Sequence, residues 1–530
     1  MARLHEYQGK ALLAKAGLPV PRGSPASTPH EAADAAKRLL SEGAAAVVVK
    51  IQAWTTGRAA IGGVAFGSTP DEARAHAQRM LAMRVGQFPV EQVLVEEKLD
   101  IAPGGEYFVS LSIDDKLRAP VLLISLSGGS GVEERARQVH RVPCDVIKGP
   151  DQAELERIFA PAGPRAADLA RAARTVFDVA RANEARSVEV NPLVVTRDGR
   201  ILAADCRITI DDYAASRHPD LGIDIARELD HPPTALERIA YAAEQADHRG
   251  TFYFAQLATE PAPGSKGLIG FHGAGGGGSM MSMDAITAEG FTIANFTDTS
   301  GNPSAAKVYR AARIILSQPG LVGYFGSGSG VASQEQFWSA YGLAKAFWEV
   351  NLDIPAVIRL GGNSEDRAVE ILQDACRDLP TTVEGYKKTD PPKKIAARFA
   401  TLVAEAGGKR WEPRPPSQLR RPAFVGSPSA ASFPIRGGRV WIDAARWRDI
   451  APAVIARSSG LLRDAGGRPE PTLPPEELAG KDSEFIACEV ECRRIGIDGV
   501  FVELEIPGLD ALESGKWRME SGNPAAPGVR

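Results

Sequence analysis

The strongest chemical signal in the sequence is a pair of apolar runs joined by a polar turn. The runs cover residues 188–195 and 201–205, and an Asp-Gly pair at 198–199 lies between them. Such a turn between two apolar runs predicts a β-hairpin. Folding the hairpin about this pair places Asn191 opposite a neighbour of Asp205, within the one residue of slack that a proline after Asn191 introduces.

Three oxygen-bearing side chains of this hairpin could bind a metal ion. Side chains alternate along a strand, so Glu189 and Asn191 share one face, and Asp205 ends the opposite strand. Mg²⁺ prefers hard oxygen ligands and usually shares them with substrate phosphates. The hairpin therefore indicates a magnesium site. The alternative is a solvated sheet edge.

A second group of residues resembles a phosphate clamp. Lys50 ends an apolar run, and a loop containing Gly57 and Arg58 follows it. A cation that faces a glycine-bearing loop can hold a phosphate, because the anion needs both a charge and close backbone approach. The alternative is a strand-end lysine in water beside an ordinary loop.

Two further glycine loops lie in the second half of the chain. Residues 273–278 match the pattern GxGxxG directly after an apolar run, and Asp298 follows twenty residues after the loop. That spacing is typical of a dinucleotide site. However, a glycine loop at a helix N-terminus binds any anion. Residues 326–330 form a similar loop, so the two loops could instead converge on one small anion.

The surrounding pattern indicates an α/β protein of several domains. Thr28-Pro29 and Thr69-Pro70 are each followed by a glutamate, which predicts two helix N-termini, and β-branched runs at 46–49, 93–95, 108–113 and 121–126 predict strands. From about residue 262 the order becomes strand, glycine loop, helix, which implies a parallel sheet. The expected parts are a mixed α+β domain over 1–245, a doubly wound domain over 262–405, a Pro/Arg-rich linker over 406–434 and a small α+β extension over 435–530.

Composition excludes several classes of function. The 530 residues carry a formal net charge of −4, which indicates neither a nucleic-acid partner nor a membrane-binding basic patch. Five scattered cysteines, without a CxxC pair, predict neither a disulfide scaffold nor a zinc site. Charged residues near the N-terminus interrupt any signal-peptide core. We therefore expect a cytoplasmic protein.

Several ordered motifs resemble the β subunit of succinyl-CoA synthetase and its relatives, the nucleoside-diphosphate-forming acyl-CoA ligases. They cover roughly residues 1–400 in family order. The matching segments are Leu-His-Glu-Tyr-Gln-Gly-Lys at 4–10, Val-Val-Lys at 48–50, Glu-Val-Asn-Pro-Leu-Val at 189–194, Gly-Ala-Gly at 273–275, Ala-Asn-Phe at 294–296, Arg-Leu at 359–360 and Gly-Asn at 362–363.

The resemblance implies an ATP-grasp domain followed by a flavodoxin-like CoA-ligase domain. It also implies site residues, each at a position that matches a family motif. Lys50, Gly57 and Arg58 would contact nucleotide phosphates, Glu96 would lie beside the base, Glu106 would be a further nucleotide-site acid, Asn191 and Asp205 would bind Mg²⁺, and Glu189 would face a phosphorylated histidine.

The same resemblance implies a partner chain. In this family an α-type subunit carries the phosphorylated histidine and the CoA site, in an αβ or α₂β₂ assembly. The expected substrates are ATP or GTP, CoA and a carboxylic acid, and the expected reaction relays a phosphoryl group from the nucleotide through histidine to the acid. The altered loop at residues 55–60 leaves the choice between ATP and GTP open.

Departures from the family pattern concern the acid. His272 replaces an asparagine that contacts the acid, and the loops at 297–302 and 325–331 differ from the family. We expect an acid other than succinate, bound by His272, Gly328, Ser329 and Gly330, with the Ser327 hydroxyl assisting. The alternatives are neutral drift around succinate, the large subunit of a citrate- or malate-CoA ligase or ATP-citrate lyase type enzyme, an NAD(P)-dependent oxidoreductase and a non-catalytic scaffold. The extension beyond residue 400 has no family counterpart, and we expect it to pack on the α partner or on a second copy.

Overall fold

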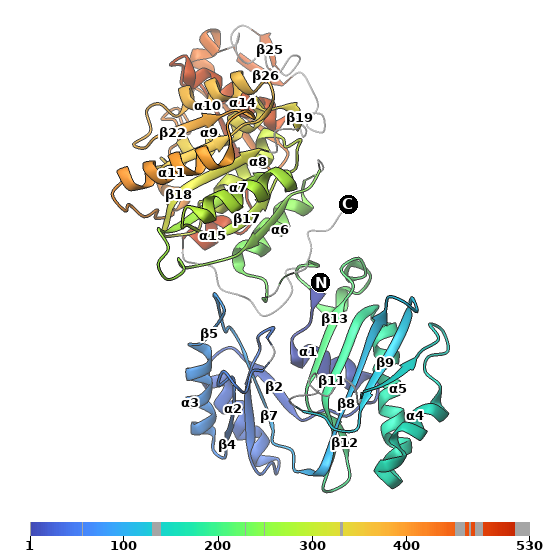
Figure 1. Ribbon diagram of the computed structural model, residues 1–530. Coiled ribbons are helices and arrows are strands. Elements are labelled where there is room, and N and C mark those ends of the chain that lie inside the picture. The colour runs from blue at the N-terminus through green and yellow to red at the C-terminus, as the bar shows by residue number, and fades with distance from the viewer. Residues whose placement is uncertain are drawn as a thin grey trace. The chain divides into compact units, whose positions relative to one another are not determined.

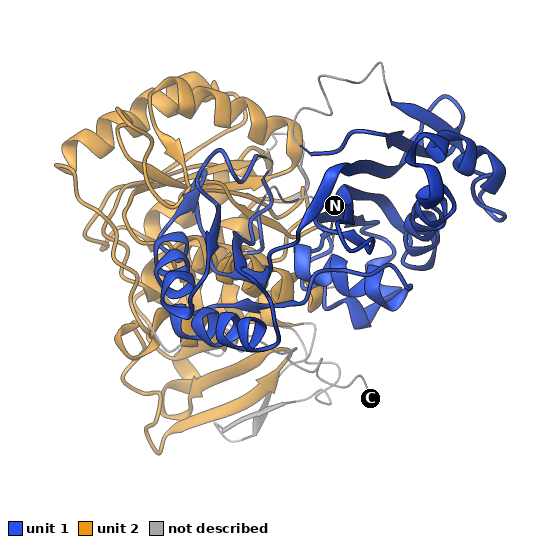
Figure 2. Ribbon diagram, turned by 90° about the horizontal axis from the view of Figure 1, so that it is seen from below, with its two compact units in different colours: residues 1–233 blue, residues 234–530 orange. Residues whose placement is uncertain are grey.

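The computed structural model describes residues 2–55, 57–129, 139–227, 229, 231–247, 250–328, 332–450, 462–465, 468–471 and 481–514. The chain forms two compact units, Met1–Pro233 and Thr234–Arg530 (Figure 2). Among the described residues, no helix has the length and apolar character needed to cross a membrane.

The first unit contains a small lobe with a four-stranded antiparallel sheet in the order β2-β7-β3-β4. Thr28 and Thr69 cap its two helices by accepting hydrogen bonds from the backbone N–H groups of Glu31 and Glu72, as the sequence predicts. Alanines on both helices pack on the valines of the sheet. The elements are β2 (Gly23–Ala26), α2 (Pro29–Ser41), β3 (Val47–Ile51), β4 (Val64–Gly67), α3 (Pro70–Leu81), β5 (Arg84–Val85), β6 (Phe88–Pro89) and β7 (Val93–Glu97).

A larger antiparallel sheet completes the first unit, in the order β1-β13-β11-β8-β9-β10. Its elements are β1 (Ala2–Arg3), α1 (Glu6–Lys15), β8 (Ile101–Asp114), β9 (Ala119–Ser125), β10 (His140–Pro143), α4 (Gln152–Phe159), α5 (Ala166–Ala182), β11 (Ala185–Thr196), β12 (Ile201–Ala203) and β13 (Cys206–Ile210). Helices α4 and α5 cover one face (Figure 1), where Val188 and Val190 join the apolar core. Alternation along β11 therefore turns Glu189 to the other face.

The hairpin of β11 and β12 has a longer turn than the sequence suggests. Leu193 pairs with Ala203, and the backbone N–H of Thr196 donates to the carbonyl of Arg200. Three residues therefore form the turn, and its Gly199 takes a positive φ of 83°, as a three-residue hairpin loop requires. The register differs by one residue from an exact fold about the Asp-Gly pair, which is within the slack that the prediction allowed. Asn191 faces Asp205 itself, and its N–H donates to the Asp205 carbonyl at 3.2 Å.

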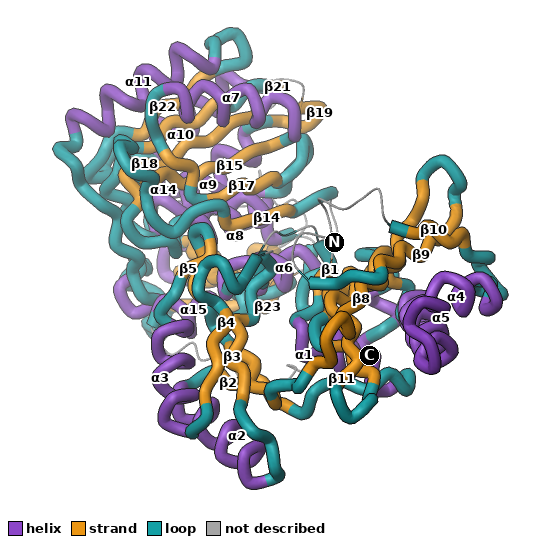
Figure 3. The backbone as a smooth tube through the Cα atoms, turned by 60° about the horizontal axis from the view of Figure 1, so that its bottom comes forward, coloured by secondary structure: helices purple, strands orange, loops and turns teal. Residues whose placement is uncertain are grey.

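The second unit is built on one large sheet, whose strands Figure 3 draws in orange. Most of its strand pairs are parallel. Its strands are β14 (Tyr253–Gln256), β15 (Leu268–Ala274), β16 (Thr292–Ile293), β17 (Asn295–Asp298), β18 (Leu321–Gly328), β20 (Ala356–Arg359) and β22 (Val383–Tyr386). The parallel strands follow the order β17-β15-β18-β20-β22. In chain order this is 2-1-3-4-5, the flavodoxin-like arrangement, whose ligand edge lies where the order reverses.

Helices cover both faces of this sheet. They are α6 (Ala235–Gln245), α7 (Gly276–Ala288), α8 (Ala305–Ile315), α9 (Phe337–Glu349), α10 (Glu365–Ala375) and α11 (Pro392–Glu405), and a small pair of strands, β19 (Ala332–Glu335) and β21 (Gly362–Asn363), accompanies them. Helices α7 and α11 pack together, and α8, α9 and α10 form a separate layer. Helix α7 begins at Gly276, so residues 276–278 of the predicted glycine loop form its first turn.

The C-terminal extension packs on its own chain. It contains β23 (Ala430–Ile435), β24 (Gly438–Asp443), β25 (Leu462–Ala465), β26 (Arg468–Pro471), α14 (Asp482–Arg494), β27 (Val500–Leu504) and α15 (Leu509–Glu513). Helix α14 lies against α8 and α9, and its apolar side chains share one core with theirs. The described part of α14 therefore buries its apolar side chains within the second unit, and packing of the extension on the α partner or on a second copy stays a prediction.

Candidate active site

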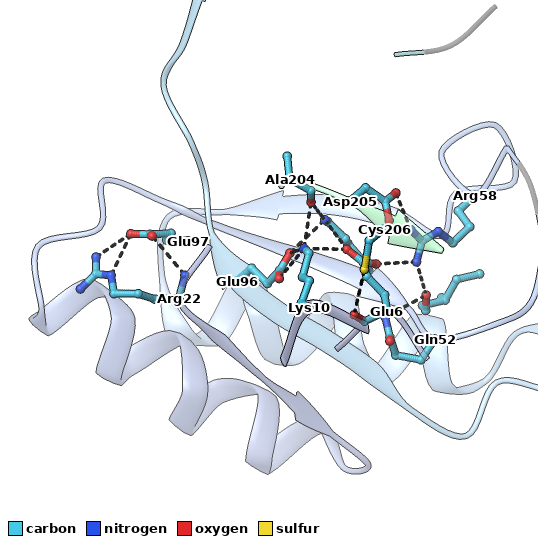
Figure 4. A network of polar contacts seen from close by, with 12 residues as sticks. Glu6, Lys10, Arg22, Gln52, Arg58, Glu96, Glu97, Ala204, Asp205 and Cys206 are labelled. Carbon is cyan, nitrogen blue, oxygen red and sulfur yellow. Dashed lines mark hydrogen bonds and ion pairs between the residues drawn. The ribbon is translucent and has the colours of Figure 1, made fainter. Parts of the chain in front are cut away.

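Six charged side chains meet between the lobes of the first unit (Figure 4). They come from α1, from β3 and the loop after it, from β7 and from the connection between β12 and β13. Three are cations and three are carboxylates, and their ion pairs join both lobes into one network: Glu6, Lys10, Lys50, Arg58, Glu96 and Asp205.

Lys50 lies at the centre of this network. Its Nζ is 2.9 Å from Glu6 and 2.9 Å from Glu96, and it donates to the Ala204 carbonyl at 3.0 Å. Burial opposes the charge on Lys50, but Glu6 and Glu96 overcome this effect and raise its pKa. The ammonium is therefore permanently charged near neutral pH.

Glu6 also belongs to this network, although motif spacing did not identify it. Its carboxylate binds Lys10 at 2.7 Å, Lys50 at 2.9 Å and Arg58 at 2.7 Å. Burial raises the pKa of this carboxyl, but the three cations lower it well below its usual range. One signal was present in the sequence, since Glu6 and Lys10 stand four residues apart, the spacing that brings helix side chains together.

Arg58 connects the first helix to the hairpin. One guanidinium nitrogen binds Glu6 at 2.7 Å and donates to the Ile51 carbonyl at 3.1 Å, and the other binds Asp205 at 2.6 Å. Asp205 is the most exposed of the six side chains, at 32%. Partial burial and the nearby Glu6 raise its pKa.

Asn191 lies next to Asp205 and also contacts the loop after β9. The N–H of Gly129 donates to its side-chain oxygen at 2.8 Å, which leaves that oxygen a second lone pair. An amide oxygen and a carboxylate on opposite strands are hard donors of the kind Mg²⁺ binds. The residues present therefore fit a magnesium ion that shares its remaining positions with phosphate oxygens and water.

Glu106 and Glu96 lie in different surroundings. Glu106 is exposed, and a Cβ added at Gly129 would be 3.9 Å from its carboxylate, so it borders the same loop as Asn191. Glu96 is 2% exposed and accepts from Lys10 at 2.6 and 2.7 Å. Its carboxylate therefore holds the two lysines in place.

Glu189 and Gly57 occupy the positions that the sequence indicates. Glu189 is half-buried on the polar face of β11, opposite Arg207 and Ser110. It lies two residues from Asn191 along that strand. Gly57 takes a positive φ of 65° in the exposed loop that carries Arg58, and no atom lies close to where its Cβ would be.

The expected acid-binding residues lie in the second unit, where His272 is 6% exposed in β15. Its Nδ1 is 2.5 Å from the Tyr324 hydroxyl, and its Nε2 is 3.2 Å from Thr299 Oγ1. Burial lowers the pKa of His272 to about 4. Both ring nitrogens therefore have partners inside the second unit, and contact of His272 with the acid stays a prediction.

The neighbouring loop residues are also enclosed where they are described. Ser327 is 2% exposed and its hydroxyl is 2.7 Å from that of Ser282. A Cβ at Gly328 would be 2.9 Å from the Arg359 carbonyl, so only glycine fits there. Ser329 and Gly330 lie outside the described residues.

The GxGxxG loop is held by the acidic residue that follows it. Asp298 accepts hydrogen bonds from the N–H groups of Gly275 and Ser300, both at 2.8 Å. A dinucleotide site would use such an acid for a ribose hydroxyl. Here one oxygen of Asp298 instead accepts hydrogen bonds from two backbone segments. The acid that would bind a ribose hydroxyl in a dinucleotide site therefore holds the loop itself.

The two lobes and their charged site define the ATP-grasp class, and the family model for an ATP-grasp domain matches residues 3–195. The chain is 36% identical over 393 residues to the β subunit of GDP-forming succinate–CoA ligase from Thermus thermophilus, a match over 72% of this chain and 97% of that protein. It is also 34% identical to the β subunit of ADP-forming succinate–CoA ligase from Bacteroides thetaiotaomicron, a match over 72% of this chain and 97% of that protein. The chain belongs to the succinate–CoA ligase β-subunit family.

A solved structure supports the fold. ATP citrate lyase from Methanothrix soehngenii, in complex with citrate and coenzyme A, aligns with a TM-score of 0.58 and 18% identity, over 76% of this chain and 99% of that one. Nearly all of each relative is matched, whereas about a quarter of this chain is not.

Proposed function

We propose that this chain is the β subunit of a nucleoside-diphosphate-forming carboxylate–CoA ligase. One observation carries the proposal: Lys50, Arg58, Asn191 and Asp205 come together within the segment of the first unit that includes the ATP-grasp match. Membership of the succinate–CoA ligase family supports it, and the relatives include both ADP-forming and GDP-forming enzymes. Either nucleotide triphosphate agrees with the site.

In this proposal each residue has a distinct task. Lys50 and Arg58 hold the phosphates, with Gly57 allowing close approach of the loop, and Asn191 and Asp205 hold Mg²⁺, with Glu106 beside them. When bound, Mg²⁺ neutralises phosphate charge. Catalysis is then mostly positioning and electrostatic stabilisation, for which the rigid ion-pair network is suited.

Glu189 would act on a partner. An α-type subunit would bring the phosphorylated histidine and the CoA site, and Glu189 would face that histidine while its phosphoryl bond forms and breaks. The carboxylic acid would accept the phosphoryl group and form an acyl phosphate. The CoA thiolate would then attack the acyl carbon and release inorganic phosphate. An αβ or α₂β₂ assembly in the cytoplasm completes the proposal.

The acid is proposed to differ from succinate. The loop at 297–302 departs from the family pattern, and Thr299, within that loop, is packed against His272. His272 would then act by shaping this loop, while Gly328, Ser329 and Gly330 stay proposed acid contacts. An exchange of asparagine for a buried histidine changes what the loop packs on, which is a physical route to a different pocket.

Release of ADP and GDP by the purified chain with its α-type partner tests the function. The assay supplies CoA with succinate, citrate or malate in turn. We expect CoA-dependent release that Asp205→Ala abolishes and that Asp198→Asn, on the exposed turn of the same hairpin, leaves intact. Mg²⁺-independent nucleotide binding, or binding of NADH in its place, would contradict the proposal, and a clear preference for succinate would refute the different acid.

A further inference from the structure

Arg58 forms an ion pair with Asp205, the proposed metal ligand. Its guanidinium nitrogen is 2.6 Å from Asp205 Oδ2, and Figure 4 shows the side chain reaching across to this carboxylate. The other nitrogen is fixed by Glu6 and by the Ile51 carbonyl. Arg58 is 14% exposed. The contacts of both guanidinium nitrogens hold its side chain beside Asp205.

The three cations and three carboxylates of the cluster balance one another in charge. Lys10, Lys50 and Arg58 pair with Glu6, Glu96 and Asp205, and the ion pairs of Lys50 are with Glu6 and Glu96. Arg58 is therefore the cation whose release would expose Asp205. Asp205 is also the carboxylate most accessible to an incoming ion.

A divalent cation arriving alone would meet two obstacles. It would have to break the ion pair of Arg58 with Asp205, and it would leave the guanidinium beside a second positive charge with no new partner. A nucleotide changes this balance, because its phosphates offer the guanidinium a planar, bidentate acceptor. Asp205 then becomes available at the moment when the phosphates also need neutralising.

We propose that Arg58 is the internal counter-cation of Asp205, so that the site accepts a divalent cation only together with a nucleotide. This inference rests on the proposed role of Asp205 as a metal ligand. It assigns Arg58 two successive partners, the carboxylate before binding and the phosphates after it. The result is that free metal does not occupy the site before the substrate arrives.

Binding of Mn²⁺ to the full nucleotide-free chain, followed by electron paramagnetic resonance, tests the inference. Loss of a buried counter-cation should tighten Mn²⁺ binding by about tenfold or more in Arg58→Gln. Arg22→Gln is the matched control, because it removes the same charge from the ion pair with Glu97, which Figure 4 shows away from the cluster. This control should bind Mn²⁺ as the unchanged chain does.

Two further variants separate the possible failures. Asp205→Asn added to Arg58→Gln should remove the gained affinity. Arg58→Lys keeps the charge but lacks the fork that spans two carboxylates, and should give an intermediate affinity with less disturbance of the fold. If Arg58→Gln and Arg58→Lys bind Mn²⁺ no more tightly than Arg22→Gln, while Asp205→Asn abolishes Mg²⁺-dependent nucleotide binding, the inference fails and the proposed function stands. If Asp205→Asn leaves that binding intact, both fail.

Discussion

Lys345 in α9 and Glu489 in α14 lie 3.0 Å apart, and both side chains are fully buried. Glu489 also accepts a hydrogen bond from the N–H of Val502 at 2.8 Å, and Lys345 lies over the ring of Phe501. The pair therefore joins a helix of the parallel-sheet domain to both a helix and a strand of the extension. Its burial shows that the extension is an integral part of the second unit.

Breaking this pair should destabilise the second unit strongly. Lys345→Met leaves Glu489 and Glu349 buried without their shared cation, and removal of one partner of a buried ion pair costs about 3–5 kcal/mol. Urea unfolding measures the loss. Arg377→Gln, which breaks an exposed pair with Asp374, should cost at most about 1 kcal/mol. Equal effects of the two substitutions would show that the buried pair does not anchor the extension.

Removal of residues 411–530 should expose the layer of α8 and α9. Tyr309 and Tyr341 are fully buried in that layer, which shares its core with the extension, and large exposed apolar patches cause association. We expect the truncated chain to bind a hydrophobic dye and to aggregate in gel filtration. A chain that ends at Ser514 keeps the described contacts and should do neither. A monodisperse truncated chain without dye binding would contradict this.

The sequence held a signal for this packing. Helix α9 reads Phe-Trp-Ser-Ala-Tyr-Gly-Leu-Ala-Lys-Ala-Phe-Trp-Glu, which is apolar on nearly every side. A helix that is apolar all round is buried all round, and a sheet covers only one side of a helix that packs on it. The covering segment could not be identified, because pairing between residues 345 and 489 depends on tertiary contacts that local patterns do not encode.

In the candidate site, too, the sequence predicts some contacts and not others. The closeness of Asn191 and Asp205 could be predicted because a short turn fixes the register of a hairpin. The length of the turn accounts for the one residue by which the register differs from an exact fold about the Asp-Gly pair. The ion pairs of Glu6 and Glu96 with Lys50 could not be predicted from the sequence, because these three residues lie on three separate elements. Predicting contacts between such elements requires knowledge of how the lobes pack.

Glu189→Gln should separate nucleotide binding from phosphoryl transfer. The proposal gives this carboxylate no contact with the nucleotide, so affinity for ATP or GTP should stay unchanged. Release of the diphosphate with the α-type partner should fall by about 10²–10⁴-fold, the usual contribution of a positioned acid or base. Glu184→Gln, at the exposed ion pair with Arg217, is the control. Parallel loss of binding and turnover in Glu189→Gln would assign Glu189 to the nucleotide site instead.

His272 should make the folded chain sensitive to mild acid. Burial lowers its pKa from 6.5 to about 4, so the unfolded chain binds a proton between these values while the folded chain does not. Stability contributed by the neutral ring is thus complete above pH 6.5 and is lost as the pH falls to about 4. The total loss in the free energy of unfolding is roughly 3 kcal/mol.

Two measurements check this behaviour. In NMR spectra of the chain with labelled histidine, the resonance that disappears in His272→Asn should not titrate near pH 6.5. Urea unfolding across the same window should show a smaller loss of stability in His272→Asn than in the unchanged chain, because the substitution removes a proton-binding site that folding suppresses. Titration of His272 at its ordinary pKa would mean that the ring is open to water and can face the acid after all.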